Sequence, residues 1–204
     1  MKRCEWCEGS ELYMHYHDTE WGVPSFDDRT HFEFLVLESA QAGLSWITIL
    51  KKRENYRKAY DNFDPEKVAR YTEKKKEKLL ADPGIVRNRL KIEASISNAR
   101  HFREIQKEFG GFSAYIWGFT KKDSAGNYRP VVGKWKSLSE LPARTELSDK
   151  IALDMKKRGF RFLGSVILYS HMQATGIVND HITGCFRYKE IRRIYAKPVG
   201  RDAV

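Results

Sequence analysis

The most continuous hydrophobic pattern of the chain, at residues 32–37, predicts a buried helix. Apolar side chains occupy two neighbouring faces there at the spacing of an α-helix, and Asp27 or Asp28 can cap its amino end. We expect this helix to continue to Ala42. Glu38 stands inside the apolar pattern with no Lys or Arg within one turn, and burying an unpaired carboxylate is costly. Either Glu38 is a buried acid that awaits a partner, or it reaches the surface or accepts a backbone amide.

A turn and a second helix follow. Gly43 suits a helix end, Leu44 is left on the turn, and Ser45 can cap a helix that runs from Trp46 to about Tyr60. The pattern therefore places an acid and an indole on two abutting helices, with an apolar side chain at the corner between them.

The rest of the pattern is mainly helical. Further helices are predicted from Asp64, up to Leu80, through Ile92 and Phe102, and over 114–119, 148–158 and 164–174. The polar segment 120–135 is expected to be a loop or hairpin, and residues 1–24 show no helix pattern. With no repeat and no long linker, the sequence predicts an all-α fold in one domain, residues 1–188, followed by a basic, mobile tail at 189–204.

Composition and charge narrow the class of protein. A chain of 204 residues with 41% hydrophobic and 13% aromatic residues can fill one core or two small lobes that share an interface. It contains no apolar run of membrane-spanning length and no signal peptide, so we expect a cytoplasmic protein without a membrane partner. The net charge of +10 favours a polyanionic partner such as nucleic acid, although part of it can serve solubility alone.

The cysteines and histidines predict a metal site. Metal-ligand residue types stand at both ends of the chain, Cys4 and His17 near its start and His181 and Cys185, one helical turn apart, near its end. Two thiolates and two imidazoles suit one zinc ion, and four protein ligands would make that zinc structural. Cys7 and His15 are competing ligands, and unrelated buried cysteines and histidines are the simpler alternative.

A Pro-Gly turn at Pro83 and Gly84 joins two helical stretches and resembles a helix-hairpin-helix motif. Backbone amides at the start of the second helix can hold a DNA phosphate without reading the sequence. Arg87, Arg89 and Lys91 add positive charge nearby. The turn is a common one, so it indicates DNA binding mainly in combination with the overall charge.

With these parts in place, the chain resembles the 3-methyladenine DNA glycosylase I family, bacterial repair enzymes of the helix-hairpin-helix glycosylase superfamily. The resemblance runs from residue 1 to about 187, and the segments that carry it are 16–18, 20–24, 41–48, 51–56, 156–160 and 178–181. The loop 120–136 looks longer than is usual in the family, and it and the tail are expected to stay clear of the site.

The resemblance implies roles for particular residues. The zinc ligands would be Cys4, His17, His181 and Cys185, with Cys7 a bystander. The excised base would contact Glu38, Tyr16 and Trp46, in a pocket also lined by Trp6, Tyr13 and Trp21. Leu44 would enter the gap left by the flipped nucleotide, beside Gln41 and Gly43, while Gly84 and Arg87 would contact DNA at the hairpin. The implied partner is double-stranded DNA with alkylated bases, bound by a monomer at the bacterial nucleoid.

The implied chemistry matches these residue types. 3-Methyladenine is cationic while attached to DNA, so aromatic faces attract it, by about 0.5–2 kcal/mol per contact. The carboxylate of Glu38 could accept a hydrogen bond from its exocyclic amine. The catalytic Asp of many superfamily members has no counterpart here, since its neighbourhood holds only Glu104, expected to be exposed. Lys91 lies past the position of a lyase nucleophile, so a monofunctional glycosylase is predicted.

Three alternatives remain open from the sequence. A DNA-binding module without chemistry would leave the aromatic residues around Glu38 unexplained. A zinc-dependent hydrolase would need an open coordination position on the metal. A related glycosylase could prefer another lesion, such as 3-methylguanine or 7-methylguanine.

Overall fold

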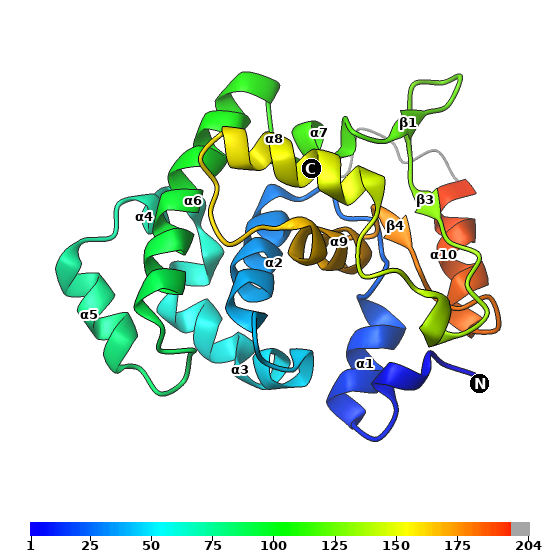
Figure 1. Cartoon of the computed structure of the whole chain (residues 1–204), viewed down its shortest axis with the longest axis horizontal. Coiled ribbons are helices and arrows are strands. Elements are labelled where there is room, and N and C mark those ends of the chain that lie inside the picture. The colour runs from blue at the N-terminus through cyan, green and yellow to red at the C-terminus, as the bar shows by residue number, and fades with distance from the viewer. Residues whose placement is uncertain (197–204) are drawn as a thin grey trace.

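The protein is built mainly from α-helices around a central helix, α2 (Asp28–Gln41), in a computed structural model that describes residues 1–196. Asp27 caps α2, its side chain accepting a hydrogen bond from Thr30 N. The helix is buried on nearly all sides, as its continuous apolar pattern predicts. Figure 1 shows α3 (Trp46–Ala59), α6 (Arg89–Phe109) and α9 (Ser165–Ala174) arranged around it.

Four shorter helices pack against this central group of helices. Next to α3 and α6 lie α4 (Pro65–Ala69), capped by Asp64, and α5 (Glu73–Ala81), while α7 (Phe112–Trp117) and α8 (Glu146–Lys157) cover the other end of α2. Single 3-10 turns occur at Glu5–Cys7, Asp61–Phe63 and Leu138–Glu140. The turn between α5 and α6 contains Pro83 and Gly84, as expected.

The amino-terminal segment forms a helix that the sequence pattern did not predict. Helix α1 (Glu11–Thr19) is capped by Ser10 and buries Tyr16 and His17. Its inward face carries a tyrosine and a histidine instead of aliphatic side chains, so it lacks the usual apolar repeat. The prediction that residues 1–24 contain no helix is therefore wrong.

Helix boundaries elsewhere shift for identifiable reasons. Thr145, not Ser148, is the N-cap of α8; Ser148 completes a capping box with it, so the helix starts at Glu146. Helix α7 begins at Phe112 because the side chain of Asp28 accepts hydrogen bonds from the amides of Phe112 and Ser113.

Helical structure continues beyond residue 188. Helix α10 (Phe186–Ala196) extends past that boundary and buries Ile191 completely, so α9 is not the last core helix and residues 189–196 are not a mobile tail. The remainder of the expected tail, 197–204, lies outside the described residues. Figure 1 places α10 beside the amino-terminal segment, where Phe186 N donates to Lys2 O at 3.0 Å.

The polar segment 120–135 contains short strands. The expected hairpin is present, with β1 (Lys121–Lys122) antiparallel to β2 (Tyr128–Arg129). Immediately after it, β3 (Val131–Val132) pairs in parallel with β4 (Val178–Asn179). This segment thus attaches to the chain just before His181.

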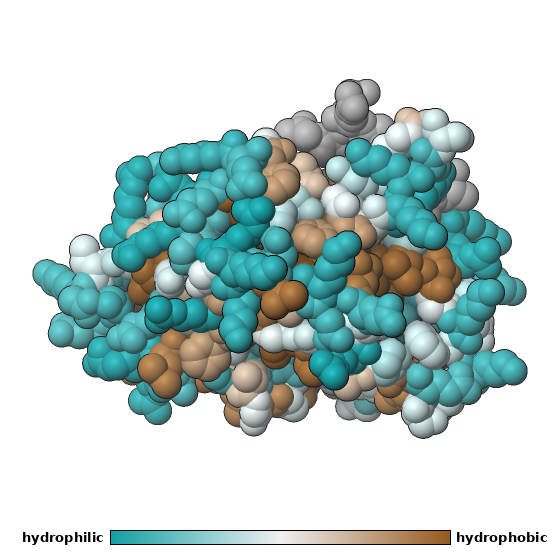
Figure 2. Space-filling model, turned by 45° about the horizontal axis from the view of Figure 1, so that its top comes forward, coloured by the Kyte–Doolittle hydropathy of each residue, from teal (hydrophilic) through white to brown (hydrophobic). Residues whose placement is uncertain are grey.

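The apolar interior has two parts. The larger cluster joins α2, α3, α6, α7, α8 and α9, while a smaller one contains Cys4, Tyr16, Trp21, Phe34, Leu50, Ala174, Ile182 and Cys185. Trp46 packs against both. Figure 2 shows that the surface is mainly hydrophilic on the face in view, with hydrophobic residues gathered in a band across its middle. None of the described helices is long and apolar enough to cross a membrane.

Candidate functional site

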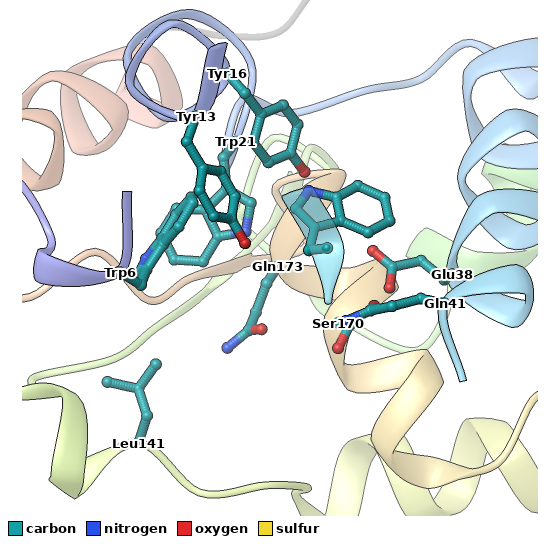
Figure 3. Close-up of a pocket in the computed structure, with 10 residues that line it drawn as sticks. Trp6, Tyr13, Tyr16, Trp21, Glu38, Gln41, Leu141, Ser170 and Gln173 are labelled. Carbon is teal, nitrogen blue, oxygen red and sulfur yellow. The ribbon is translucent and has the colours of Figure 1, made fainter. Parts of the chain in front are cut away.

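A cavity of about 190 Å³ opens between α1, α2, α3 and α9. Six of its lining residues were predicted from the sequence: Trp6, Tyr13, Tyr16, Trp21, Glu38 and Trp46. Gln41 also lines it. Figure 3 shows Trp6, Tyr13 and Trp21 on one side of the cavity and Glu38 with Gln41 on the other. The residues expected to contact a base are therefore brought together.

Glu38 is the buried acid of this cavity. The residue is only 3% exposed, and its Oε2 atom has no hydrogen-bond partner among the described residues. Burial raises the pKa of its carboxyl group to about 8. The interpretation in which Glu38 reaches the surface is thus wrong, and the carboxyl group has unused hydrogen-bonding capacity directed at a cavity, as a ligand-binding acid requires.

Aromatic rings form the opposite wall. Trp6 lies edge-on to both Tyr13 and Trp21, with ring centroids 5.0 Å apart in each pair. Tyr16 lies 5.8 Å from Trp46, which in turn stacks near Phe34. Burial, and next the charge of Glu38, raise the pKa of Tyr16, so its hydroxyl stays protonated. The wall presents flat apolar surfaces together with neutral hydroxyl groups.

A partly buried ion-pair network supports this wall. Arg53 on α3 donates to Glu33 on α2 and to Glu20 at the end of α1, at 2.6 Å in each case. The guanidinium carbon also lies 5.2 Å from the centre of the Phe34 ring. Arg53 therefore ties together the three helices that carry Tyr16, Glu38 and Trp46.

Three further residues, Leu141, Ser170 and Gln173, line the cavity and were not predicted. Ser170 and Gln173 are polar residues one turn apart on the apolar helix α9, and this pairing was the available signal. Leu141 follows a 3-10 turn in an irregular segment, where no periodic pattern marks it.

The loop 120–136 influences the cavity only through intermediate residues. It supplies none of the lining residues, but Trp135 Nε1 donates to Asp180 Oδ1 at 2.7 Å. The other oxygen of Asp180 accepts from Gln173 Nε2 at 2.9 Å and from the hydroxyl of Tyr169. The loop thus helps to fix the side chain of Gln173 in the cavity.

A cluster of four buried metal-ligand residues lies directly behind Trp6 and Trp21. The ligand atoms of Cys4, His17, His181 and Cys185 all lie within 4.8 Å of one another. The two sulfurs and two imidazole nitrogens are donors that suit zinc, and the residues come from both ends of the described chain. The group could hold a metal ion, with the composition expected from the sequence.

Partners outside the cluster orient both imidazoles. His17 Nδ1 lies 2.8 Å from Asp18 Oδ1, and Asp18 also binds Arg3. His181 Nε2 lies 3.0 Å from Trp21 O. Each ring therefore directs its other nitrogen into the cluster, the arrangement common for metal-bound histidines.

The thiols also distinguish the cluster from its competitors. Hydrogen bonding with Cys4 lowers the pKa of Cys185 and raises that of Cys4, so one thiolate forms readily. Cys7 instead donates its thiol hydrogen to Cys4 O at 3.0 Å, and burial raises its pKa to about 11. Neither Cys7 nor His15 belongs to the group of possible metal ligands among the described residues.

Apart from Gln41, the predicted DNA-contacting residues lie on two turns outside the cavity lining. Gly43 has a positive φ of 83°, and Leu44 on the same turn is 42% exposed. Gly84 and Arg87 lie on the turn between α5 and α6, which we call the hairpin from here on. This turn is away from the cavity lining, and Arg87 is exposed. The amides of this turn mostly have partners within the protein: Gly84 N donates to Asp82 Oδ1 at 2.7 Å, and Val86 N donates to the Tyr56 hydroxyl at 3.1 Å.

Comparison with known proteins places this site in context. A family model described as methyladenine glycosylase matches residues 6–188. DNA-3-methyladenine glycosylase 1 of Escherichia coli (strain K12) is 48% identical over 188 residues, covering 92% of this chain and 97% of the relative.

Solved structures agree with this match. A crystal structure of 3-methyladenine DNA glycosylase I superposes with a TM-score of 0.83 at 49% identity, covering 91% of this chain and 98% of that chain. A variant of such an enzyme in complex with 3-methyladenine superposes with a TM-score of 0.84 at 34% identity, covering 91% and 96%. The likeness thus extends over about nine tenths of the chain.

Proposed function

Because the chain belongs to the methyladenine glycosylase family, we propose that it flips 3-methyladenine out of alkylated duplex DNA and excises it in the cavity beside Glu38. Its relatives are DNA-3-methyladenine glycosylases, hydrolases of N-glycosyl bonds, so the chain is an enzyme of base-excision repair. The preference for this lesion, the flipping step and the monofunctional reaction are the proposed parts.

The observation that carries the proposal is the unpartnered carboxyl oxygen of Glu38 in an aromatic cavity. A carboxylate there accepts a hydrogen bond from the exocyclic amine of the flipped base and offsets its positive charge. The aromatic wall adds cation–π attraction, about 0.5–2 kcal/mol per contact. Bases without positive charge or without that amine gain less from both walls.

The reaction needs little acid catalysis from the protein. Methylation at N3 places a positive charge on the base, so its glycosidic bond breaks with a neutral base as leaving group. Water then adds to the sugar and gives up one proton to the solvent, and the other products are free 3-methyladenine and an abasic strand. The side chains hold the extruded base and stabilise its departure, consistent with a site that contains one buried acid and neutral hydroxyl groups.

Leu44 is proposed to occupy the space that the flipped nucleotide leaves. It is an exposed apolar side chain on a tight turn between the helices that carry Glu38 and Trp46. Insertion into the duplex would therefore place the extruded base next to the cavity. A phosphate of the same duplex is proposed to bind at the hairpin. It would contact the exposed Arg87 and Arg89 and the backbone amides at the start of α6.

Zinc is proposed as the ion of the Cys4, His17, His181 and Cys185 cluster. With all four positions filled by protein, its contribution is structural: it fastens the two ends of the described chain behind Trp6 and Trp21. Structural zinc contributes roughly 10 kcal/mol or more of apparent folding free energy in small peptides.

The test is to incubate methylated duplex DNA with the folded protein and to quantify the released bases and the DNA product. We expect release of 3-methyladenine, little 7-methylguanine, and an abasic strand that remains uncut until it is treated with alkali. Spontaneous strand cleavage or a borohydride-trapped protein–DNA adduct would contradict the monofunctional reaction. Binding of DNA with no release of any methylated base would favour the DNA-binding module without chemistry.

A further inference from the structure

The ammonium group of Lys91 is directed at the end of helix α2. Its Nζ atom donates to Ala40 O at 2.9 Å and to Ala42 O at 2.6 Å. The carbonyl of Ala40 belongs to the last turn of α2, where helix carbonyls have no partner within the helix, and a cation is favoured at this end. Burial lowers the pKa of the Lys91 ammonium group from its ordinary value of 10.5.

These bonds join the two segments proposed to touch DNA. Lys91 belongs to the first turn of α6, and its own amide donates to the capping residue Asn88 at 3.1 Å. Ala42 directly precedes Gly43 and Leu44 on the exposed turn. The lysine therefore runs from the start of the hairpin's second helix to the base of the turn that carries Leu44.

A second set of contacts closes the same unit from the other side. Lys52 Nζ on α3 donates to Pro83 O at 2.8 Å, and the Tyr56 hydroxyl accepts from Val86 N at 3.1 Å. A side-chain carbon at Gly84 would lie 3.0 Å from Asn55 Cβ, so the hairpin packs tightly on α3. The space remaining between α2, α3 and α6 beside Lys91 is only about 10 Å³.

We propose that Lys91 is a positioning residue that couples the hairpin to the Leu44 turn, so that binding a phosphate at the hairpin sets where Leu44 enters the duplex. The proposal rests on the function proposed above. It assigns Lys91 neither a phosphate contact nor a nucleophilic role, because both short bonds of its ammonium group go to backbone carbonyls. The residue acts through Leu44 and touches neither the base nor the reacting bond.

The test compares Lys91→Met, which keeps an unbranched side chain one atom shorter and removes its donors, with Arg87→Met on the same hairpin. Three quantities are measured for each: single-turnover release of 3-methyladenine from duplex DNA, affinity for free 3-methyladenine, and the salt dependence of duplex binding. Misplacing a group by about 1 Å can cost on the order of 100-fold in rate, so we expect a loss of about 10- to 100-fold for Lys91→Met.

The pattern of effects separates positioning from other roles. For Lys91→Met we expect unchanged free-base affinity, an unchanged salt slope, and a weaker fluorescence rise from 2-aminopurine placed beside the lesion. Lys91→Arg, which keeps the charge and donors, should recover part of the rate. Arg87→Met should instead lower the salt slope by about one unit, as expected for loss of one phosphate contact.

Several results would overturn the inference. A salt slope that falls for Lys91→Met as it does for Arg87→Met would make Lys91 a phosphate contact. An equal loss of free-base affinity would indicate general loosening of the pocket, and an unchanged release rate would remove any role. If the wild-type protein released no methylated base, the proposed function itself would fail; a normal wild-type rate with an unaffected variant would defeat only the coupling.

Discussion

The ring of Tyr16 on α1 lies 5.8 Å from the ring of Trp46 at the start of α3, inclined by 51°. The two residues belong to separate helices, and Trp46 packs on both apolar clusters of the protein. Both rings line the cavity together with Glu38. The aromatic wall is thus assembled from separate helices, and its shape depends on how α1 and α3 pack together.

Replacing Trp46 by leucine should weaken binding of free 3-methyladenine. Loss of one aromatic face removes about 0.5–1.5 kcal/mol of stacking attraction for the neutral free base, which corresponds to a change of about 2- to 13-fold in Kd. Isothermal titration calorimetry at neutral pH measures this change. Trp46→Phe retains an aromatic face and should bind more tightly than the leucine variant; equal affinities of the two variants would contradict a stacking role.

Replacing Leu44 by alanine should slow base release from duplex DNA without affecting the folded state. Leu44 is exposed, so its truncation changes the free energy of unfolding by less than about 0.5 kcal/mol. We expect a release rate at least about 10-fold lower, the order of loss typical of a displaced reacting group, with unchanged affinity for the free base. Leu153→Ala, at an exposed leucine on α8, is the matched control and should release the base at the wild-type rate. An unchanged rate for Leu44→Ala would rule out its insertion.

Replacing Cys185 by serine should remove the metal and destabilise the protein. We expect one zinc per wild-type chain by elemental analysis and none in the variant. A loss of about 3 kcal/mol or more of stability lowers Tm by about 10 °C in a chain of this size. Cys7→Ser, at a buried cysteine outside the cluster, should keep its zinc. Retention of zinc by Cys185→Ser, or its loss from Cys7→Ser, would refute the ligand assignment.

Glu38 should make the stability of the free protein depend on pH. Burial raises its pKa from 4.5 to about 8, so between these values the folded state holds a proton that the unfolded state releases. Its contribution to stability is therefore complete below pH 4.5 and is lost as pH rises through 8. Glu38→Gln lacks this proton, so its stability relative to wild type should rise with pH, by at most about 1.4 kcal/mol per unit. Urea denaturation at pH 5, 6, 7 and 8 measures the difference; a difference independent of pH would contradict the raised pKa.

The sequence predicted the helical core well because its signals are local. The apolar pattern before Glu38, the caps at Asp27 and Asp64 and the Pro83–Gly84 turn act within a few residues, and the structure confirms each of them. The acid was also recognisable, since an unpaired Glu in a buried helix contradicts its surroundings. What the pattern could not supply was the partner across the cavity.

The remaining features depend on contacts between distant segments. Helix α1 is stabilised by packing of Tyr16 and His17 against residues from the other end of the chain, so its local pattern is weak. The side chain of Gln173 is held by its hydrogen bond to Asp180, which also accepts a hydrogen bond from Trp135 in the loop 120–136. The direction of Lys91 toward the end of α2 was equally hidden from its neighbours in the sequence.

The measurement that tests the role of Glu38 most directly is the pH dependence of kcat/KM for release of 3-methyladenine, compared between wild type and Glu38→Gln. This ratio reports the ionisation of the free enzyme. If the carboxylate recognises the cationic base, the wild-type value should rise with pH up to about 8 and then level off, following the raised pKa of Glu38. The Glu38→Gln value should be lower and flat between pH 6 and 9. Identical profiles for the two folded proteins, or a wild-type value that falls as pH rises toward 8, would contradict recognition by the buried acid.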